Sequence, residues 1–398
     1  MSGTYFRKGF GLKREISASL AADYHSQLVD RIRSEGSELR AGDLTVRLAK
    51  EFGFCYGVDR AVEYAYEATA RFRDKRIFLI GEIIHNPHVN RTLEEKGVSI
   101  LRPGEGGRFD YSALTADDVV IVPAFGVKVA DFQHLRELGC VLVDTTCGSV
   151  LNVWKRVEQY ARDGYTALVH GKHLHEETKA TVSHVSRYEG GKYLIVRGRR
   201  ETDAVCRFIE EGGDPAVLAR EFRDKASEGF HFERDLERVG IANQTTMLVS
   251  ESLAIAGRVR AAMARRYGDE NLSRHFRSFE TICSATQERQ DAVLQLIEGP
   301  VDLMVVIGGY NSSNTNHLAK ICAARRPTFH IADASCIDPE TGVIRYKPID
   351  SMEETSATGW LGEGPRVVGI TAGASTPNNK IGETIERILQ ARGLCVPD

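Results

Sequence analysis

The sequence has no long apolar run, only two tryptophans and no strong excess of one charge. Its hydrophobic segments all fall short of the roughly 20 residues that a membrane-spanning helix needs, so we expect no membrane span. A formal net charge of −3 gives no indication of nucleic acid or an anionic membrane as a partner. The first segment lacks the apolar core of a signal peptide and carries acidic residues throughout, unlike a transit peptide. We therefore expect a cytoplasmic protein.

The eight cysteines lack the spacing of a disulfide framework or a CxxC motif, which favours a reducing compartment. Five of them have no feature that separates them from small core hydrophobes. These five are Cys140, Cys206, Cys322, Cys336 and Cys395.

The other three cysteines share one local pattern, because each stands directly before an amphipathic helical segment. The segments begin at Cys55 (CYGVDRAVEYAYEA), Cys147 (CGSVLNVWKRVEQYA) and Cys283 (CSATQERQDAVLQLI). A thiol at a helix N-terminus lies beside unpaired N–H groups and the positive end of the helix dipole, which stabilise its thiolate. Three thiolates suit zinc or an iron–sulfur cluster, and spacing alone does not separate these metals. A cubane cluster normally takes four cysteines, so three would leave one iron open.

Short β-rich runs alternate with helical patterns along most of the chain, which predicts an α/β fold with mainly parallel sheets. The predicted strands are Thr45–Leu48, Ile77–Ile80, Val119–Val122, Val141–Val143, Thr166–Val169, Tyr193–Val196, Val239–Ala242, Leu303–Ile307, Thr328–Ile331 and Val367–Ile370. We divide the chain into an N-terminal arm (1–44, helical from Ile16 to Ser34) and three similar α/β units, 45–147, 148–279 and 280–398. A charged insertion, 197–238, is predicted to form surface helices in the second unit.

A dense polar loop, HGKHLHEET, follows the predicted strand that ends at Val169. In an extended loop, His173, His175 and Glu177 would lie on one side, because side chains of extended backbone alternate. A histidine next to a glutamate suits proton delivery and the binding of an oxyanion. A solvated loop without function is the alternative.

Two turns in the third unit combine glycine with small hydroxyl and amide side chains before a predicted helix. They are GGYNSSNTN (308–316) and TAGASTP (371–377). Such turns offer backbone N–H groups to an anion, although they match neither a Walker A loop nor GxGxxG. Helix capping explains either turn alone, but two in one unit favour phosphate binding. Both His85, in GEIIHNPHV, and the turn Asn243–Thr246 are open to structural and functional interpretations.

Together these segments resemble the LytB family, the 4-hydroxy-3-methylbut-2-enyl diphosphate reductases, from about Thr45 to Ile388. The motifs that carry the resemblance occur in the family's order: GFCYGVDRA, GEIIHNPHV, DTTCGSV, HLHEETKAT, NQTTM, TICSATQERQ, GGYNSSNTNHL and GITAGASTP. The segments RKGFG and VPAFGV resemble the plant and cyanobacterial branch.

The resemblance implies three α/β units around a central cavity and a [4Fe–4S] cluster with one open iron. The implied cluster ligands are Cys55, Cys147 and Cys283. The implied diphosphate-binding residues are His85, His175, Ser312, Ser313, Asn314 and Ser375. Glu177 matches the acid that supplies protons, Thr245 lies beside the departing hydroxyl, and Thr246 and Thr286 line the pocket.

The implied reaction is reductive dehydroxylation of 4-hydroxy-3-methylbut-2-enyl diphosphate to isopentenyl and dimethylallyl diphosphate, the last step of the non-mevalonate isoprenoid pathway. A one-electron donor protein such as ferredoxin is the implied partner. One departure is Phe125, where the shorter bacterial enzymes carry a histidine, so one diphosphate contact is absent or is supplied by Lys128 or a backbone N–H. The alternatives are a zinc hydrolase of a phosphorylated small molecule, using His173, His175 and cysteines, and a non-catalytic phosphate-binding or redox-sensing protein.

Overall fold

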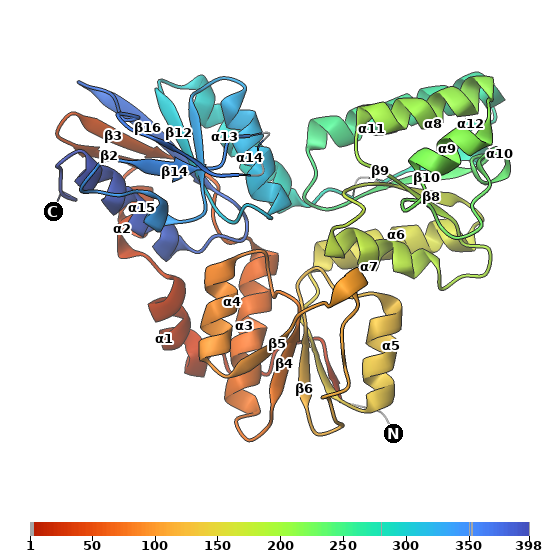
Figure 1. The fold of residues 1–398 in the computed structure, drawn as a ribbon, viewed down its shortest axis with the longest axis horizontal. Helices are drawn as coiled ribbons and strands as arrows, with labels where there is room; N and C mark the ends of the chain where they lie inside the picture. Colours follow the sequence, from red (N-terminus) through yellow and green to blue (C-terminus); the bar gives the residue numbers. More distant parts are fainter. Residues whose placement is uncertain (1–3, 280, 350, 352, 398) are drawn as a thin grey trace. The chain divides into compact units, whose positions relative to one another are not determined.

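The structure is a computed structural model that describes residues 4–279, 281–349, 351 and 353–397. It divides into two compact units, each made from two separate stretches of chain. Unit 1 comprises Met1–Arg7 and Pro103–Cys283, and unit 2 comprises Lys8–Arg102 and Ser284–Asp398. Strands and helices alternate in both (Figure 1), so the predicted α/β class with mainly parallel sheets is confirmed. The predicted boundaries at 44/45, 147/148 and 279/280 stay a prediction.

Unit 1 contains one sheet whose strands are all parallel and three further parallel strands. Its elements are β1 (Tyr5–Phe6), η1 (Glu105–Gly107), β6 (Val119–Val122), α5 (Val129–Leu138), β7 (Val141–Asp144), α6 (Gly148–Arg162), β8 (Thr166–His170), α7 (Glu176–Val185), β9 (Tyr193–Val196), α8 (Arg199–Glu211), α9 (Pro215–Glu221), α10 (Phe232–Asp235), β10 (Val239–Asn243), α11 (Val249–Tyr267), α12 (Leu272–His275) and β11 (Phe276–Ser278). The parallel sheet has the order β11-β10-β8-β9, and the further strands pair as β1-β7-β6.

Unit 2 is built around a five-stranded sheet that is parallel except at one edge. Its elements are α1 (Lys13–Tyr24), α2 (Gln27–Ser34), β2 (Glu38–Ala41), β3 (Leu44–Leu48), α3 (Tyr56–Arg71), β4 (Ile77–Ile80), α4 (Pro87–Glu95), β5 (Val98–Leu101), α13 (Ser284–Glu298), β12 (Leu303–Ile307), α14 (Ser313–Ala323), β13 (Thr328–Ile331), η2 (Ala334–Cys336), β14 (Ile344–Tyr346), β15 (Thr355–Ala357), β16 (Arg366–Ala372) and α15 (Asn378–Ala391). The sheet order is β13-β12-β16-β3-β2, with β2 antiparallel to β3. The pair β4–β5 is parallel and the pair β14–β15 is antiparallel.

The ten predicted strands are all present, and each end lies within two residues of its predicted position. The strands that the sequence did not predict are short or polar, such as β2 (ELRA), β11 (FRS) and β15 (TSA). These segments lack a run of β-branched residues, so pairing with a neighbour decides their conformation. Strand β3 pairs with β16, so the start of the predicted first unit shares a sheet with strands of the predicted third unit.

The arm that was predicted to be helical from Ile16 to Ser34 contains two helices with a break between them. Helix α1 ends at Tyr24, and His25 has extended backbone. Ser26 then caps α2, since its side chain accepts a hydrogen bond from the backbone N–H of Val29 at 3.3 Å. A serine that caps a new helix is a local reason for the old one to end.

The charged segment 197–238 forms the predicted helices α8, α9 and α10. Helix α8 is not wholly superficial, because Val205 and Phe208 are buried in a cluster that includes Ile255 and Val259 of α11. Its amphipathic pattern therefore supplies one side of a core layer.

Successive side chains of the central strands point to opposite faces of each sheet and so belong to two different core clusters. In unit 2, Val305 and Ile307 of β12 belong to the cluster that includes α2 and α15, whereas Met304 and Val306 contact α13 and α14. In unit 1, Leu168 of β8 belongs to the cluster with α8 and α11, and its neighbours Ala167 and Val169 to the cluster with α6 and α7. A strand that is covered on both faces reads as a continuous apolar run, which is why these strands were predictable.

The parallel register brings particular turns together at the carboxyl ends of the strands. In unit 1, Asn243 of β10 lies opposite His170 of β8, so the turns that follow them are neighbours. In unit 2, β12 pairs with β16 and β16 pairs with β3, so the turns that follow these three strands are also neighbours. Turns at this edge are where open α/β sheets bind their ligands. Among the described residues, no helix has the length and apolar character to cross a membrane.

Because His330 of the unit 2 sheet is buried, we predict that the free energy of unfolding falls in acid. The side chain of His330 donates from Nε2 to the carbonyl of Gly308 at 3.0 Å, and burial lowers its pKa from 6.5 to about 4. Between these pH values the unfolded chain binds a proton that the folded chain does not, so stability falls as the pH falls. The fully developed loss corresponds to about 3 kcal/mol.

The variant His330→Gln retains an amide donor but does not titrate. Over this pH interval we expect its free energy of unfolding to fall by about 3 kcal/mol less than that of the unmodified chain. Urea unfolding at a series of pH values measures the difference. His25→Gln, at an exposed histidine of the arm, serves as the control and should keep the full loss. Equal acid sensitivity of His330→Gln and His25→Gln would contradict the argument.

Candidate active site

A buried carboxylate in unit 1 is held by the turn that follows β10. Glu177 lies in the first turn of α7, and only 3% of its surface is exposed. Its Oε1 accepts from the backbone N–H of Thr245 at 2.6 Å, and its Oε2 accepts from the hydroxyl of Thr245 at 3.0 Å. Glu177 and Thr245, to which the resemblance gives neighbouring roles, are therefore in direct contact.

The polar loop that supplies Glu177 is not extended, so the alternation expected of His173, His175 and Glu177 in an extended loop does not apply. His175 caps α7, and its Nδ1 accepts from the backbone N–H of Glu177 at 3.2 Å. Two acidic residues, Glu176 and Glu177, then fall in the first helical turn, where the helix dipole favours negative charge. Because Nδ1 is the acceptor, the neutral imidazole carries its proton on Nε2.

Sequence reasoning missed Gln244, whose side chain joins this loop to the turn after β10. Its Oε1 accepts from the backbone N–H of Lys172 at 3.0 Å and from the hydroxyl of Thr178 at 3.2 Å. Its Nε2 donates to the hydroxyl of half-buried Thr246 at 2.9 Å. An amide offers both donors and an acceptor, and its place beside Thr245 in the NQTT turn was the available signal.

The ring of Phe125 lies edge-on to that of His175, with 6.2 Å between ring centroids. The departure noted in the sequence therefore puts an apolar ring against one of the predicted diphosphate ligands. Lys128 stands directly before α5. Its predicted part in replacing the missing histidine stays a prediction.

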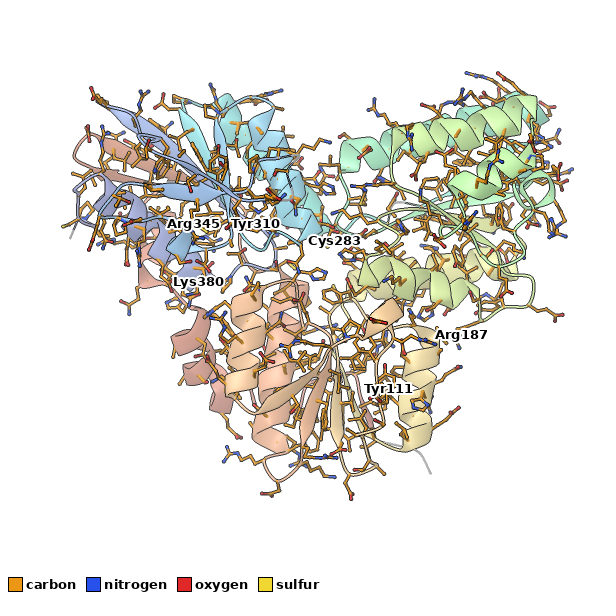
Figure 2. All side chains as sticks on the ribbon, in the orientation of Figure 1. Tyr111, Arg187, Cys283, Tyr310, Arg345 and Lys380 are labelled. Carbon is orange, nitrogen blue, oxygen red and sulfur yellow. The ribbon has the colours of Figure 1, made fainter. Side chains whose placement is uncertain are left out.

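Two of the three patterned cysteines belong to unit 1 and lie near one another through Ser149. Cys147 occupies the N-cap position of α6, and Ser149 in the first turn donates from its hydroxyl to the Sγ of Cys283 at 3.3 Å. The backbone N–H of Cys283, which Figure 2 labels, donates to the carbonyl of Thr245 at 3.4 Å. Cys147 and Cys283 are half-buried free thiols. Cys283 therefore connects the start of α6 with the turn that holds Glu177.

The third patterned cysteine, Cys55, occupies the N-cap position of α3 in unit 2 and is also half-buried. Its backbone N–H donates to the carbonyl of Ala374 at 3.3 Å. The guanidinium of Arg289, 3% exposed, donates to the two preceding carbonyls, at 2.8 Å to Gly53 and 3.0 Å to Phe54. Sequence reasoning missed Arg289 as a positioning residue, although it stands in the TICSATQERQ motif.

The two glycine-bearing turns of unit 2 contact each other and the segment around His85. The Oδ1 of Asn314 accepts from the backbone N–H of Ala374 at 2.9 Å. Ser375 donates from its hydroxyl to the carbonyl of His85 at 3.2 Å, and its own carbonyl accepts from Asn86 at 2.8 Å. Ser312 caps α14 by accepting from the N–H of Thr315 at 3.3 Å. Four of the predicted diphosphate ligands are therefore assembled in one place.

Two polar atoms of these turns are buried without a partner among the described residues, and one of them is the hydroxyl of Thr371. The Nδ2 of Asn314 finds no acceptor among the described residues. A buried donor that lacks an acceptor costs free energy, which a bound anion would recover. The Nδ1 of His85 lies 2.8 Å from Glu82, and the remaining predicted residues of unit 2, Ser313 and Thr286, are buried at the starts of their helices.

The cysteines without the helix-start pattern differ from these three in burial. Cys140, Cys206, Cys322 and Cys336 are buried, as predicted for core residues. Burial raises the pKa of Cys206 and of Cys322 to about 12, which keeps them as neutral thiols. Cys395 is exposed, so its predicted place in the core is wrong. It follows the last helix, between Leu394 and Val396, which pack against the core.

The chain matches a family model described as LytB protein over residues 46–389. It is 47% identical to the 4-hydroxy-3-methylbut-2-enyl diphosphate reductase of Gloeobacter violaceus, over 99% of this chain and 94% of that protein. The reductase of the same name from a Cyanothece strain is 46% identical, over 97% of this chain and 94% of the relative.

Two solved structures are similar. One is (E)-4-hydroxy-3-methyl-but-2-enyl diphosphate reductase, described as the terminal enzyme of the non-mevalonate pathway, with a TM-score of 0.53 and 28% identity, covering 86% of this chain and 98% of the other. The other is E-1-hydroxy-2-methyl-but-2-enyl-4-diphosphate reductase from Plasmodium falciparum, with a TM-score of 0.62 and 20% identity over 85% and 86% of the two chains, which supports the fold alone. The predicted resemblance, including its cyanobacterial character, is confirmed, and the chain belongs to the LytB protein family.

Proposed function

We propose that this protein catalyses the reductive dehydroxylation of 4-hydroxy-3-methylbut-2-enyl diphosphate, the last step of the non-mevalonate isoprenoid pathway. The observation that carries the proposal is the carboxylate of Glu177, almost fully buried and bound through both oxygens to Thr245. A buried acid beside a hydroxyl is an arrangement that can deliver a proton to a leaving oxygen. The names of relatives that align with almost the whole chain support the substrate.

The reaction consumes two electrons and two protons. The allylic C–O bond breaks, and one proton converts the leaving hydroxyl to water. The two electrons and the second proton complete the new C–H bond, at either end of the allyl fragment, which gives isopentenyl or dimethylallyl diphosphate. Glu177 supplies the proton to the oxygen through the hydroxyl of Thr245, and Gln244 keeps this turn in place.

The electrons require a redox group, and the cysteines that precede α3, α6 and α13 have suitable chemistry. Cys55, Cys147 and Cys283 are half-buried thiols at or directly before helix N-termini, and none of them is in a disulfide. We propose that they hold a [4Fe–4S] cluster, with Ser149 donating a hydrogen bond to the Cys283 sulfur. Such a cluster would supply electrons one at a time, together with an iron that acts as a Lewis acid. Zinc has no redox chemistry and so could not carry the electrons. A one-electron donor protein such as ferredoxin would reload it.

The diphosphate is held by neutral donors rather than by a cluster of cations. Asn314 offers its unpaired Nδ2, and Ser312, Ser313 and Ser375 offer hydroxyl and backbone N–H groups at helix starts. His85 and His175 complete the proposed set. This arrangement lets a chain of net charge −3 bind a polyanion.

Cluster ligation predicts that Cys55→Ser, Cys147→Ser or Cys283→Ser loses most of the bound iron and sulfide, because serine is a poor ligand for a soft metal. Anaerobic purification followed by iron and sulfide analysis measures the loss. Cys395→Ser, at an exposed cysteine, is the control and should keep the full content. Full iron in any of the three variants contradicts the assignment, and colourless wild-type protein with zinc supports the hydrolase alternative.

Proton delivery predicts that Glu177→Gln retains iron and substrate affinity but lowers kcat by about 10²- to 10⁴-fold. Glutamine keeps an acceptor for the N–H of Thr245 and so preserves the fold of the turn. Turnover with dithionite and a mediator dye measures the effect, with Glu189→Gln, at an exposed acid after α7, as the control. Unchanged turnover of Glu177→Gln would remove this residue from the proton path.

Diphosphate binding predicts that Asn314→Asp raises KM by about ten- to a hundredfold with a smaller change in kcat, since a hydrogen bond to a charged group is lost. The aspartate still accepts from the N–H of Ala374 and so leaves the turn intact. Gln390→Glu adds the same charge at an exposed position of α15 and should leave KM unchanged. The proposed role of Asn314 fails if both variants have the KM of the parent.

A further inference from the structure

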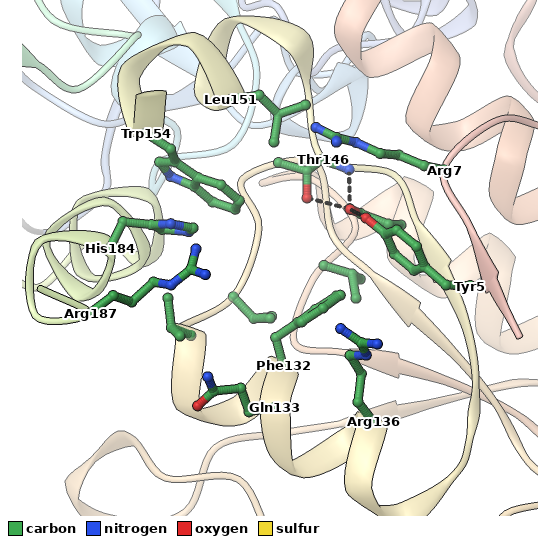
Figure 3. A pocket seen from close by; sticks show the side chains of 14 residues that line it. Tyr5, Arg7, Phe132, Gln133, Arg136, Thr146, Leu151, Trp154, His184 and Arg187 are labelled. Carbon is green, nitrogen blue, oxygen red and sulfur yellow. Dashed lines mark hydrogen bonds between the residues drawn. The ribbon is translucent and has the colours of Figure 1, made fainter. Parts of the chain in front are cut away.

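Unit 1 contains a cavity of about 310 Å³ that none of the predicted site residues lines. Figure 3 shows it between α5, α6, the segment after α7 and the N-terminal strand. The side chains that line it include Tyr5, Arg7, Arg136, Trp154 and Arg187. Its volume lies at the lower end of the range for small-molecule sites.

One part of the cavity wall is apolar and flat. Phe132 of α5 and Leu151 of α6 contribute to it, together with valines at the end of β6 and before α5. The indole of Trp154 stacks on the ring of His184, with 4.1 Å between centroids and 25° between planes. The Nε1 of Trp154 is buried and has no acceptor among the described residues. This wall suits an aromatic or other planar apolar body.

The other part of the wall carries three guanidinium groups from three separate elements. Arg7 follows β1, Arg136 lies in the last turn of α5, and Arg187 follows α7. Figure 3 shows all three side chains reaching toward the same space. Arg187 is paired with Glu158 at 3.1 Å, whereas Arg7 and Arg136 make no ion pair within the described part of the chain.

The only lining carboxylate among the described residues, that of Asp144, is already committed. Its oxygens accept from the phenol of Tyr5 at 2.5 Å and from the backbone N–H of Thr146 at 3.0 Å. The hydroxyl of Thr146 donates to it as well, at 2.5 Å. Asp144 forms no ion pair with Arg7 or Arg136 in the part of the chain that the structure describes, so both guanidinium groups can contact a ligand.

We propose that this cavity is a second ligand site, which binds a small organic phosphate with a planar apolar body. The body would lie against Trp154 and Phe132, and the phosphate would bind Arg7 and Arg136, because guanidinium groups match phosphate oxygens in geometry and charge. The site differs in kind from the neutral turns of unit 2, where amides and hydroxyls are the donors. Binding here requires neither the cluster nor turnover.

Isothermal titration of the full chain with 1-naphthyl phosphate tests the proposal. We expect saturable binding with one ligand per chain, weakened about tenfold in Arg136→Gln and in Arg7→Gln by the loss of one charge-assisted contact. Both arginines are exposed and away from the core, so both variants should fold, which circular dichroism checks. Arg325→Gln, at an exposed arginine of unit 2, is the control and should bind like the parent.

Two comparison probes separate the contributions of the two walls. We expect 1-naphthol, which lacks the charge, and inorganic phosphate, which lacks the body, each to bind at least about tenfold more weakly. No saturable binding by the parent would overturn the proposal. So would equal binding by the parent and both arginine variants, or binding of 1-naphthol as tight as that of its phosphate.

Discussion

The parallel pairing of β8 with β10 is the constraint on which the candidate active site depends. Because Asn243 lies opposite His170, the start of α7 and the turn after β10 must emerge side by side. The carboxylate of Glu177 can then accept from both the backbone and the hydroxyl of Thr245. Two hydrogen bonds to one residue fix the orientation of a buried acid more firmly than one bond would, and they compensate part of the cost of its burial.

The same geometry recurs in unit 2, with different chemistry at the strand ends. The turns after β3, β12 and β16 meet through backbone groups and the side chain of Asn314, and Ser375 connects them to the carbonyl of His85. The buried cation Arg289 donates to the two carbonyls before Cys55. An anion that binds here would be held by dipoles, which need little rearrangement when a charge arrives.

Unit 1 therefore presents two polar regions of opposite design. Glu177 is buried, and both of its carboxyl oxygens accept hydrogen bonds from Thr245, whereas the cavity beside Trp154 has exposed guanidinium groups and an apolar wall. Helix α6 contributes to both regions, since it begins after Cys147 and carries Leu151 and Trp154 one turn and two turns later. The cavity is distinguished from ordinary surface by this combination of charge and aromatic area, because scattered surface arginines rarely share a concave apolar wall.

The sequence by itself determined ten of the strands, since runs such as VVIV and LMVVI are covered on both faces, and it determined which cysteines stand at helix starts. It also identified Glu177, Thr245 and the two glycine-bearing turns through their motifs. Only the tertiary structure decided that the HLHEE loop enters a helix, that Gln244 and Arg289 hold the turns, and that Arg7, Arg136 and Trp154 share a cavity. Local propensity fixes periodicity and capping along the chain, whereas contacts between distant segments depend on strand order and register, which no local pattern encodes.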